Sequence, residues 1–157
     1  MKFFTLDLIR KLNSKDEDEA EDADDEWDRR LHEYQDSIQK IGAALPGGLV
    51  GVDLHDAKME VFSFEKKLID DTKSAELVLK CKLNNQAIVM KYTDVKKMCF
   101  DNLKKRDESV LVFSEDSFGG WLADEISQVD EGTYQHEILF DNGDFILCVF
   151  KGFCFEK

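Results

Sequence analysis

The chain of 157 residues contains one proline and no long run of apolar residues. A membrane-spanning helix needs roughly 20 consecutive apolar residues, so we expect no membrane segment. The opening stretch MKFFTLDLIRKLNSK is interrupted by Asp7 and Arg10 and is followed by no small-residue cleavage site, which argues against a signal peptide. These absences, with 43% apolar residues, predict a cytoplasmic globular protein.

Paired cysteines are also lacking. The four cysteines form no C-x-x-C pair, whereas structural zinc sites use closely spaced thiolates. In a reducing cytoplasm, unpaired cysteines behave as small apolar residues. The four are Cys81, Cys99, Cys148 and Cys154. We therefore expect no structural metal and no cofactor.

Positive charge is scarce and unevenly placed. The net charge is −13; residues 16–26 include nine acids, and residues 107–131 include eight acids and no Lys or Arg. Residues 57–106, in contrast, carry twelve basic and seven acidic residues, a net charge of +5. A surface this acidic repels phosphate, which argues against nucleic-acid binding. It favours a basic protein as partner, because opposite charge steers the encounter.

Two apolar patterns at the start of the chain predict helices. Apolar residues recur every three or four positions in residues 1–13, which predicts a short helix. A longer stripe over residues 27–45 ends before Pro46-Gly47-Gly48 and predicts an amphipathic helix. Its members are Trp27, Leu31, Tyr34, Ile38, Ile41 and Leu45. The acidic residues 14–26 between the two helices predict a solvated linker or a frayed extension of the long helix, and the last of them are placed to cap that helix.

From residue 57 the apolar period changes from 3.6 to 2, which predicts strands. Asn84-Asn85 predicts a two-residue hairpin loop that places Leu79 opposite Met90. Asn142-Gly143 predicts a type I′ hairpin that places His136 opposite Val149. A third hairpin, between residues 59–69 and 74–83, places Phe62 opposite Cys81.

Further strands are predicted at residues 94–103, 109–114 and 120–129. Consecutive strands with short turns predict an antiparallel meander of six or seven strands within residues 57–157. The predicted fold is one α+β domain over residues 1–157, with the N-terminal helices packed on this sheet. The segment Phe145–Phe150 is apolar on both faces. If no helix covers its outer side, we expect homodimerisation to cover it.

Several short motifs resemble a known group of sequences. The motifs are MKFFT at the start, ALPGGL at residues 44–49, LHD at residues 54–56, WLADEI at residues 121–126 and YQHEILFDNGDFIL at residues 134–147. They resemble a domain family of unknown function from Gram-positive bacteria. The resemblance implies a cytoplasmic bacterial protein and, by analogy, a role like that of toxin-immunity proteins, which are often small and acidic.

The favoured functional hypothesis is a non-catalytic interaction module that binds a basic partner. The residues predicted to carry it lie in the acidic run and directly after it: Asp16, Glu17, Asp18, Glu19, Glu21, Asp22 and Trp27. Trp27 has two interpretations, because a tryptophan at this place is either an exposed interface anchor or the first core contact of the long helix.

The alternative hypothesis is a small metal-dependent or ligand-binding enzyme. Its candidate residues combine imidazole and carboxylate groups, which metal sites and general bases require: His55, Asp56, Glu125 and His136. Each also has a structural interpretation. His55-Asp56 precedes a strand, and His136 lies on an apolar face. Glu125 lies in an alternating strand, where it either faces solvent or pairs with a lysine of the basic segment. The hypothesis requires the four side chains to meet in one cleft.

Overall fold

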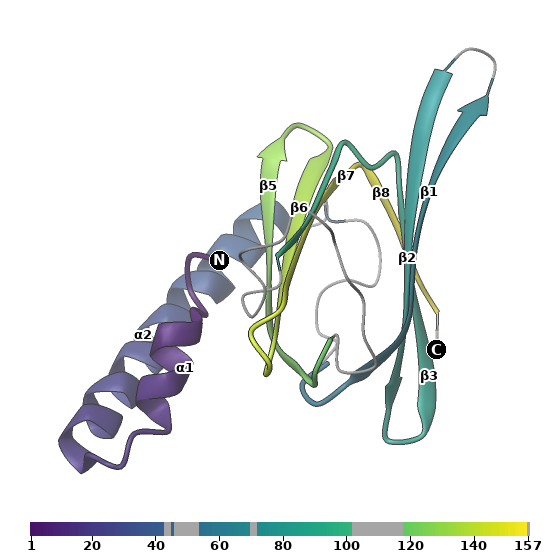
Figure 1. Cartoon of the computed structure of the whole chain (residues 1–157). Helices are drawn as coiled ribbons and strands as arrows, with labels where there is room; N and C mark the ends of the chain where they lie inside the picture. Colours follow the sequence, from purple (N-terminus) through teal and green to yellow (C-terminus); the bar gives the residue numbers. More distant parts are fainter. Residues whose placement is uncertain (43–44, 46–53, 70–71, 102–117, 157) are drawn as a thin grey trace.

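The computed structural model describes residues 1–42, 45, 54–69, 72–101 and 118–156 (Figure 1). In this part of the chain two helices, α1 (Leu6–Leu12) and α2 (Glu17–Ile41), precede eight strands. The strands are β1 (Lys58–Ile69), β2 (Thr72–Leu83), β3 (Gln86–Thr93), β4 (Lys97–Asp101), β5 (Trp121–Asp130), β6 (Thr133–Phe140), β7 (Phe145–Phe150) and β8 (Gly152–Glu156). Among the described residues, no helix combines the length and the apolar character needed to cross a membrane.

The long helix begins at Glu17 instead of Trp27, so most of the predicted acidic linker is helical. The Asp16 side chain caps it by accepting the backbone N–H groups of Asp18 and Glu19 at 3.1 and 3.3 Å. Acidic residues in the first turn are also favoured by the positive end of the helix dipole. The helix ends at Ile41, earlier than predicted, because Gly42 adopts a φ of +50°.

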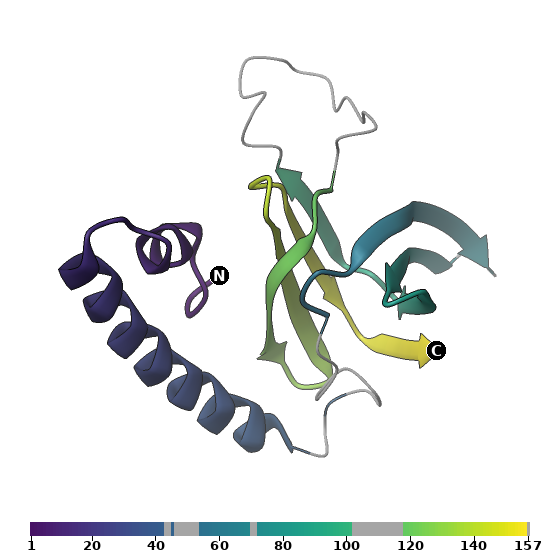
Figure 2. The same cartoon turned by 90° about the horizontal axis from the view of Figure 1, so that it is seen from below.

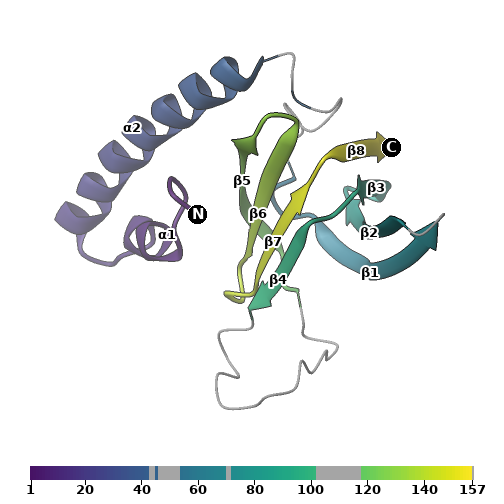
Figure 3. The ribbon, with the colours of Figure 1, turned by 90° about the horizontal axis from the view of Figure 1, so that it is seen from above.

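The apolar stripe of α2 packs against two different parts of the protein. Near its middle, Trp27 and Tyr34 pack on the ring of Phe4, with ring centroids 4.8 and 5.3 Å apart. Farther along, Ile38 and Ile41 pack against the core of the sheets. Figures 2 and 3 show the result: α1 lies against the first half of α2, while the second half of α2 runs toward the sheets. We call α1, α2 and the loop between them the helical hairpin.

The strands form two four-stranded antiparallel sheets, so the predicted single meander is wrong. Sheet A has the order β1-β2-β3-β8, and sheet B has the order β4-β7-β6-β5. The meander is interrupted because the chain passes from one sheet to the other between β3 and β4 and again between β7 and β8. At this corner Thr93 pairs with Gly152, where an added Cβ would lie 2.2 Å from the Thr93 hydroxyl oxygen. The predicted strand 109–114 lies outside the described residues.

One of the three predicted hairpin registers is confirmed. Leu79 pairs with Met90, as predicted, and Asn84 and Asn85 both have positive φ, as a type I′ turn requires. In the hairpin of β1 and β2, Phe62 pairs with Leu79 instead of Cys81. That register differs by two residues because β1 extends to Ile69 and β2 begins at Thr72, so the connection is shorter than predicted.

The hairpin of β6 and β7 is shifted by one residue, so the predicted type I′ turn is wrong. His136 pairs with Cys148 instead of Val149. The loop contains three residues, since Phe140 N–H donates to the Asp144 carbonyl at 3.0 Å and Gly143 N–H donates to the Phe140 carbonyl at 2.9 Å. Gly143 has a φ of +85°, which fits a type I turn closed by a glycine bulge.

The main core fills the space between the two sheets. Its largest side chains come from both sheets: Tyr92 and Leu77 from sheet A, and Trp121, Phe140 and Phe150 from sheet B. Complete burial of each aromatic side chain contributes roughly 1.5–3 kcal/mol. Phe3, Phe4, Leu8, Ala23 and Leu139 are also buried but lie outside this main cluster. The buried residues of the helical hairpin and of the segment before it therefore lie apart from the core of the sheets.

Candidate functional site

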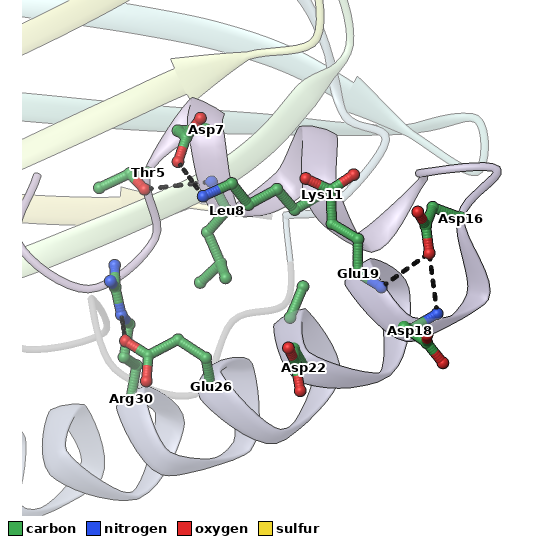
Figure 4. Close-up of a pocket in the computed structure, with 11 residues that line it drawn as sticks. Thr5, Asp7, Leu8, Lys11, Asp16, Asp18, Glu19, Asp22, Glu26 and Arg30 are labelled. Atoms are coloured by element: carbon green, nitrogen blue, oxygen red, sulfur yellow. Dashed lines mark hydrogen bonds and ion pairs between the residues drawn. The ribbon is translucent and has the colours of Figure 1, made fainter.

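A groove of about 550 Å³ lies between the two helices (Figure 4). The residues that line it come from α1 and the residue before it, the connecting loop and α2 up to its middle: Thr5, Asp7, Leu8, Lys11, Asp16, Asp18, Glu19, Asp22, Ala23, Glu26 and Arg30. Leu8 and Ala23 are the buried residues of the two helices. The helices therefore approach each other through a small apolar contact, and charged side chains form the rest of the groove.

The charge of the groove is strongly negative. Six carboxylates line it against two cations, which gives a net charge of −4. Five of the six carboxylates, Asp16, Asp18, Glu19, Asp22 and Glu26, come from the acidic run. Negative charges that follow one another in the sequence therefore lie together on one concave surface of the structure.

Both cations of the groove already have carboxylate partners. Lys11 lies 3.1 Å from Asp7, and Arg30 lies 2.5 Å from Glu26. Hydrogen bonds from Arg29 and then Arg30 lower the pKa of Glu26 to about 2, so this carboxylate stays ionised. Arg30 also donates to the Phe3 carbonyl at 3.0 Å, which fixes its guanidinium at one end of the groove.

The remaining carboxylates differ in how they are used. Asp16 caps α2, and Glu19 accepts a hydrogen bond of 2.5 Å from the Ser14 hydroxyl. The side chains of Asp18 and Asp22 are exposed and have no hydrogen-bond or ion-pair partner within the part of the chain that the structure describes. These two side chains are therefore available to a positively charged ligand.

The ionisable groups of the groove are carboxylates, one lysine and one arginine. No imidazole or thiol lines it. Across the described residues, no group of three or more His, Cys, Asp or Glu side chains is arranged to hold a metal ion. Carboxylates spread over an open surface suit a ligand whose positive charge is also spread out, such as a segment with several basic side chains.

The structure separates the predicted interaction residues into two groups. Asp16, Asp18, Glu19 and Asp22 line the groove, whereas Glu17 and Glu21 are exposed on α2 outside it. Trp27 is half-buried, and its ring packs on that of Phe4. This geometry supports the interpretation of Trp27 as a core contact of the helix.

Of the alternative enzyme residues, His136 lies in a buried hydrogen-bonded chain between the sheets. Its Nδ1 lies 2.8 Å from the Tyr92 hydroxyl, and its Nε2 lies 3.1 Å from Asp124 Oδ2. Trp121 donates to the other oxygen of Asp124 at 3.0 Å. Burial raises the pKa of Tyr92 well above its ordinary value, so its hydroxyl stays protonated. The chain of polar groups thus links β3 of sheet A to β6 and β5 of sheet B, where it satisfies buried donors and acceptors.

Glu125 lies on the opposite face of sheet B from His136, because Asp124 and Glu125 are consecutive in β5 and Asp124 faces inward. The buried Glu125 carboxylate accepts the backbone N–H groups of Lys2, Phe3 and Phe4 at 2.6–2.7 Å. Beside it, Glu137 lies 2.5 Å from the amino group of Met1. Glu125 therefore fixes the first residues of the chain to sheet B.

His55 and Asp56 are exposed before β1 and lie 3.3 Å from each other. The structure thus brings His55 to Asp56 and His136 to Asp124, and places Glu125 on the other face of sheet B. The four residues of the enzyme hypothesis do not form one cleft. Sequence reasoning missed Tyr92 and Asp124 as the partners of His136. The period of two in WLADEI was the available signal, since it places Asp124 and Glu125 on opposite faces.

No protein-family model matches the chain, and no curated protein matches it. The resemblance to a Gram-positive family of unknown function therefore stays a prediction.

Proposed function

We propose that the chain is a non-catalytic protein-interaction module whose acidic groove binds a basic segment of a partner protein. The observation that carries this proposal is the concentration of six carboxylates against two already paired cations in one concave surface. A volume of about 550 Å³ lies within the roughly 300–1,000 Å³ typical of ligand pockets, so several side chains of a partner fit there.

The position of the groove supports the same function. The helical hairpin lies beside the sheets, and in Figures 2 and 3 the start of α2 and the loop that joins it to α1 lie away from them. A partner can reach this surface without disturbing the core. The acidic surface around the groove contributes mainly to the rate of encounter, whereas contacts inside the groove determine how long the complex lasts.

The cytoplasm is the compartment that fits this module. All four cysteines are free thiols, and Cys81 and Cys148 are buried as small apolar residues. A reducing compartment maintains this state. A role like that of immunity proteins, which the resemblance suggests, is the narrower form of the proposal.

The first experiment measures binding of a short Lys- and Arg-rich peptide by isothermal titration calorimetry. The test variant is Asp18→Asn/Asp22→Asn, which neutralises the two unpartnered groove carboxylates. The control variant is Asp24→Asn/Asp25→Asn, which removes the same charge from exposed positions of α2 outside the groove. We expect the groove variant to weaken binding about tenfold and the control variant about twofold or less.

Added salt should weaken peptide binding to the parent protein, because the Debye length falls from about 10 Å at 0.1 M to about 3 Å at 1 M. Equal losses in the two variants would indicate a general acidic field instead of a binding groove. A pull-down at low salt from the native organism then identifies the partner. If the peptide does not bind and the pull-down recovers no basic protein, the proposal is wrong.

A further inference from the structure

The strand β4 forms one edge of sheet B. β4 is the outermost strand of this sheet, and its five residues pair with β7 on one side only. Among the described residues no strand lies on its other side. Lys97, Cys99 and Asp101 point to the exposed outer face of the sheet, whereas Met98 and Phe100 point inward and are partly buried. An edge that no described strand covers is a template for another strand.

The sequence of β4 is complementary to itself when it is reversed. In an antiparallel pair centred on Cys99, Lys97 of one copy lies opposite Asp101 of the other, and Met98 lies opposite Phe100. Each contact then occurs twice, as a two-fold symmetric interface requires. Neither Lys97 nor Asp101 has an ion-pair partner within the described ranges, so both charges are available for this pairing.

The other short edge strand does not have this property. β8 is the edge of sheet A and also carries a central exposed cysteine, Cys154. Reversed pairing centred on Cys154 places Glu156 opposite Gly152, with no compensating positive charge. The charges therefore favour β4 over β8 as the edge that pairs with itself. Because both strands carry an exposed central cysteine, β8 is the control for experiments on β4.

The location of β4 also reduces repulsion between two acidic molecules. In sheet B it is the strand farthest from β5, which is the strand on which α2 packs. Three strand spacings, or about 14 Å, separate the two edges. This distance exceeds the Debye length of about 8 Å at physiological ionic strength. Pairing through β4 keeps the two acidic hairpins at opposite ends of the joined sheet.

Among the described residues, the side chains that pack over β4 lie on the inner face of sheet B, so the backbone edge and the outer face of β4 are accessible to a partner. On the inner side, the centroid of the Phe118 ring lies 5.0 Å from that of Phe100 and 5.6 Å from that of Phe62. These three rings fill the inner side of β4. On the outer side, the β7 residues next to Asp101, Cys99 and Lys97 are Phe145, Leu147 and Val149, all half-buried. This outer row is the apolar surface for which the sequence predicts homodimerisation.

We propose that two copies of the chain associate through antiparallel pairing of their β4 edges, centred on Cys99, to form one continuous eight-stranded sheet. The occupant of the edge is a second copy, selected by the two reciprocal Lys97–Asp101 pairs. This interface is independent of the acidic groove, so failure of one proposal leaves the other unaffected.

The first test uses the cysteines as reporters of the interface. Directly opposed residues in antiparallel strands have Cα atoms about 4.5–5.5 Å apart, within the range of about 4.4–6.8 Å that a disulfide spans. Diamide oxidises two thiols to one disulfide and takes up their two protons and two electrons to become a hydrazine. Burial raises the pKa of Cys81 and Cys148 to about 12, so Cys99 and Cys154 are the reactive thiols.

We expect diamide to produce a covalent dimer of the parent protein and of the Cys154→Ser variant, measured on a non-reducing gel. In the Cys99→Ser variant the covalent dimer should form at least about tenfold more slowly, because Cys154 then reacts only by collision. Equal rates in the two variants, or faster crosslinking through Cys154, would overturn the proposal.

The second test exchanges the charges at the interface. Sedimentation or light scattering of the full chain should show a reversible dimer. The Lys97→Asp variant places two aspartates opposite each other and should weaken association about tenfold. The double variant Lys97→Asp/Asp101→Lys restores opposite charges and should recover dimerisation. A monomeric parent protein at all concentrations, or a double variant as weak as the single one, would contradict the interface.

Discussion

The sandwich of two sheets and the helical hairpin are stabilised by different interactions. In the sandwich, Trp121, Tyr92 and Phe140 are almost completely buried, and the buried His136 has hydrogen-bond partners on both ring nitrogens. In the two helices only Leu8 and Ala23 are buried, and most other side chains are charged and solvated. Exposed ion pairs such as Lys11–Asp7 contribute about 0–1 kcal/mol each. The sandwich therefore provides most of the stability, and the helical hairpin presents the charge.

The hairpin depends on the sandwich for its position. The first residues of the chain attach it through Phe3, Phe4 and the Glu125 carboxylate, and the Tyr34 hydroxyl accepts the Ile126 N–H at 2.9 Å. Each region contains one tryptophan, Trp27 in α2 and Trp121 in β5. Intrinsic fluorescence can therefore follow the two regions separately.

The largest expected effect is that of truncating the core of the sandwich. Trp121→Ala should lower the free energy of unfolding by about 3–5 kcal/mol, because it leaves a cavity and removes one hydrogen bond to Asp124. Trp27→Ala, at a half-buried position, should cost about 1–2 kcal/mol. Urea denaturation followed by circular dichroism measures both. Similar losses in the two variants would remove the contrast between the regions.

The next effect concerns the attachment of the hairpin. Glu125→Ala removes the acceptor of three backbone N–H groups and should cost about 3 kcal/mol, since two of the donors belong to buried residues. In a Trp121→Phe background, the emission of Trp27 should shift to the red. In a Trp27→Phe background, the emission of Trp121 should remain unchanged. A shift of the Trp121 emission would show that the two regions unfold together.

A smaller effect is expected within the sandwich at its β6–β7 turn. Gly143→Val should destabilise by about 1–3 kcal/mol, because a β-branched residue resists the positive φ of this position. Gly143→Asn is the matched control and should cost less, since asparagine tolerates positive φ. Thermal unfolding provides the measurement. Equal melting temperatures for the two variants would contradict the bulged turn.

The smallest effect belongs to an exposed pair of the hairpin. Glu26 has a folded-state pKa of about 2, below its ordinary value of 4.5, because Arg29 and Arg30 hydrogen-bond to its charged form. Its contribution to stability is therefore present above pH 4.5 and is lost as the pH falls toward 2. The melting temperature of Glu26→Gln should lie slightly below that of the parent protein above pH 5, and the two should converge near pH 2. A difference that does not change with pH would contradict this assignment.

The fold was predictable where the alternation of apolar residues and the residues of the turn indicate the same strand register. The hairpin of β2 and β3 alternates apolar residues with Lys80 and Lys82, so only one register buries its apolar face. The strand β7 is apolar on both faces, so the pattern allows two registers, and the bulged turn at Gly143 selects the one not predicted. The two-sheet arrangement depends on pairs distant in sequence, such as Met90 with Phe155, that local patterns do not specify.

The candidate site was predictable only in part. The acidic run identifies half of the groove, but the sequence left the run open between a solvated linker and a frayed helical extension, because its like charges repel each other. The spacing of Asp16 and Glu19 is that of a helix cap, and this signal marks the observed start of α2. The other wall requires α1 to pack on α2 through Leu8 and Ala23, which is a tertiary contact.

The corner that joins the two sheets also determines when the protein can finish folding during synthesis. The strands β1, β2 and β3 of sheet A are synthesised first, but β8, the second neighbour of β3, is the last of the eight strands to be synthesised. Thr93 and its partner Gly152 are separated by 59 positions in the chain, the difference of their residue numbers. At roughly 5–20 residues per second, the ribosome needs about 3–12 s to synthesise that length. During this interval the edge of β3 is uncovered, and Lys91, which lies 3.4 Å from Glu76 in the folded protein, places a charge on this strand. Charged residues of this kind disfavour premature pairing with other strands.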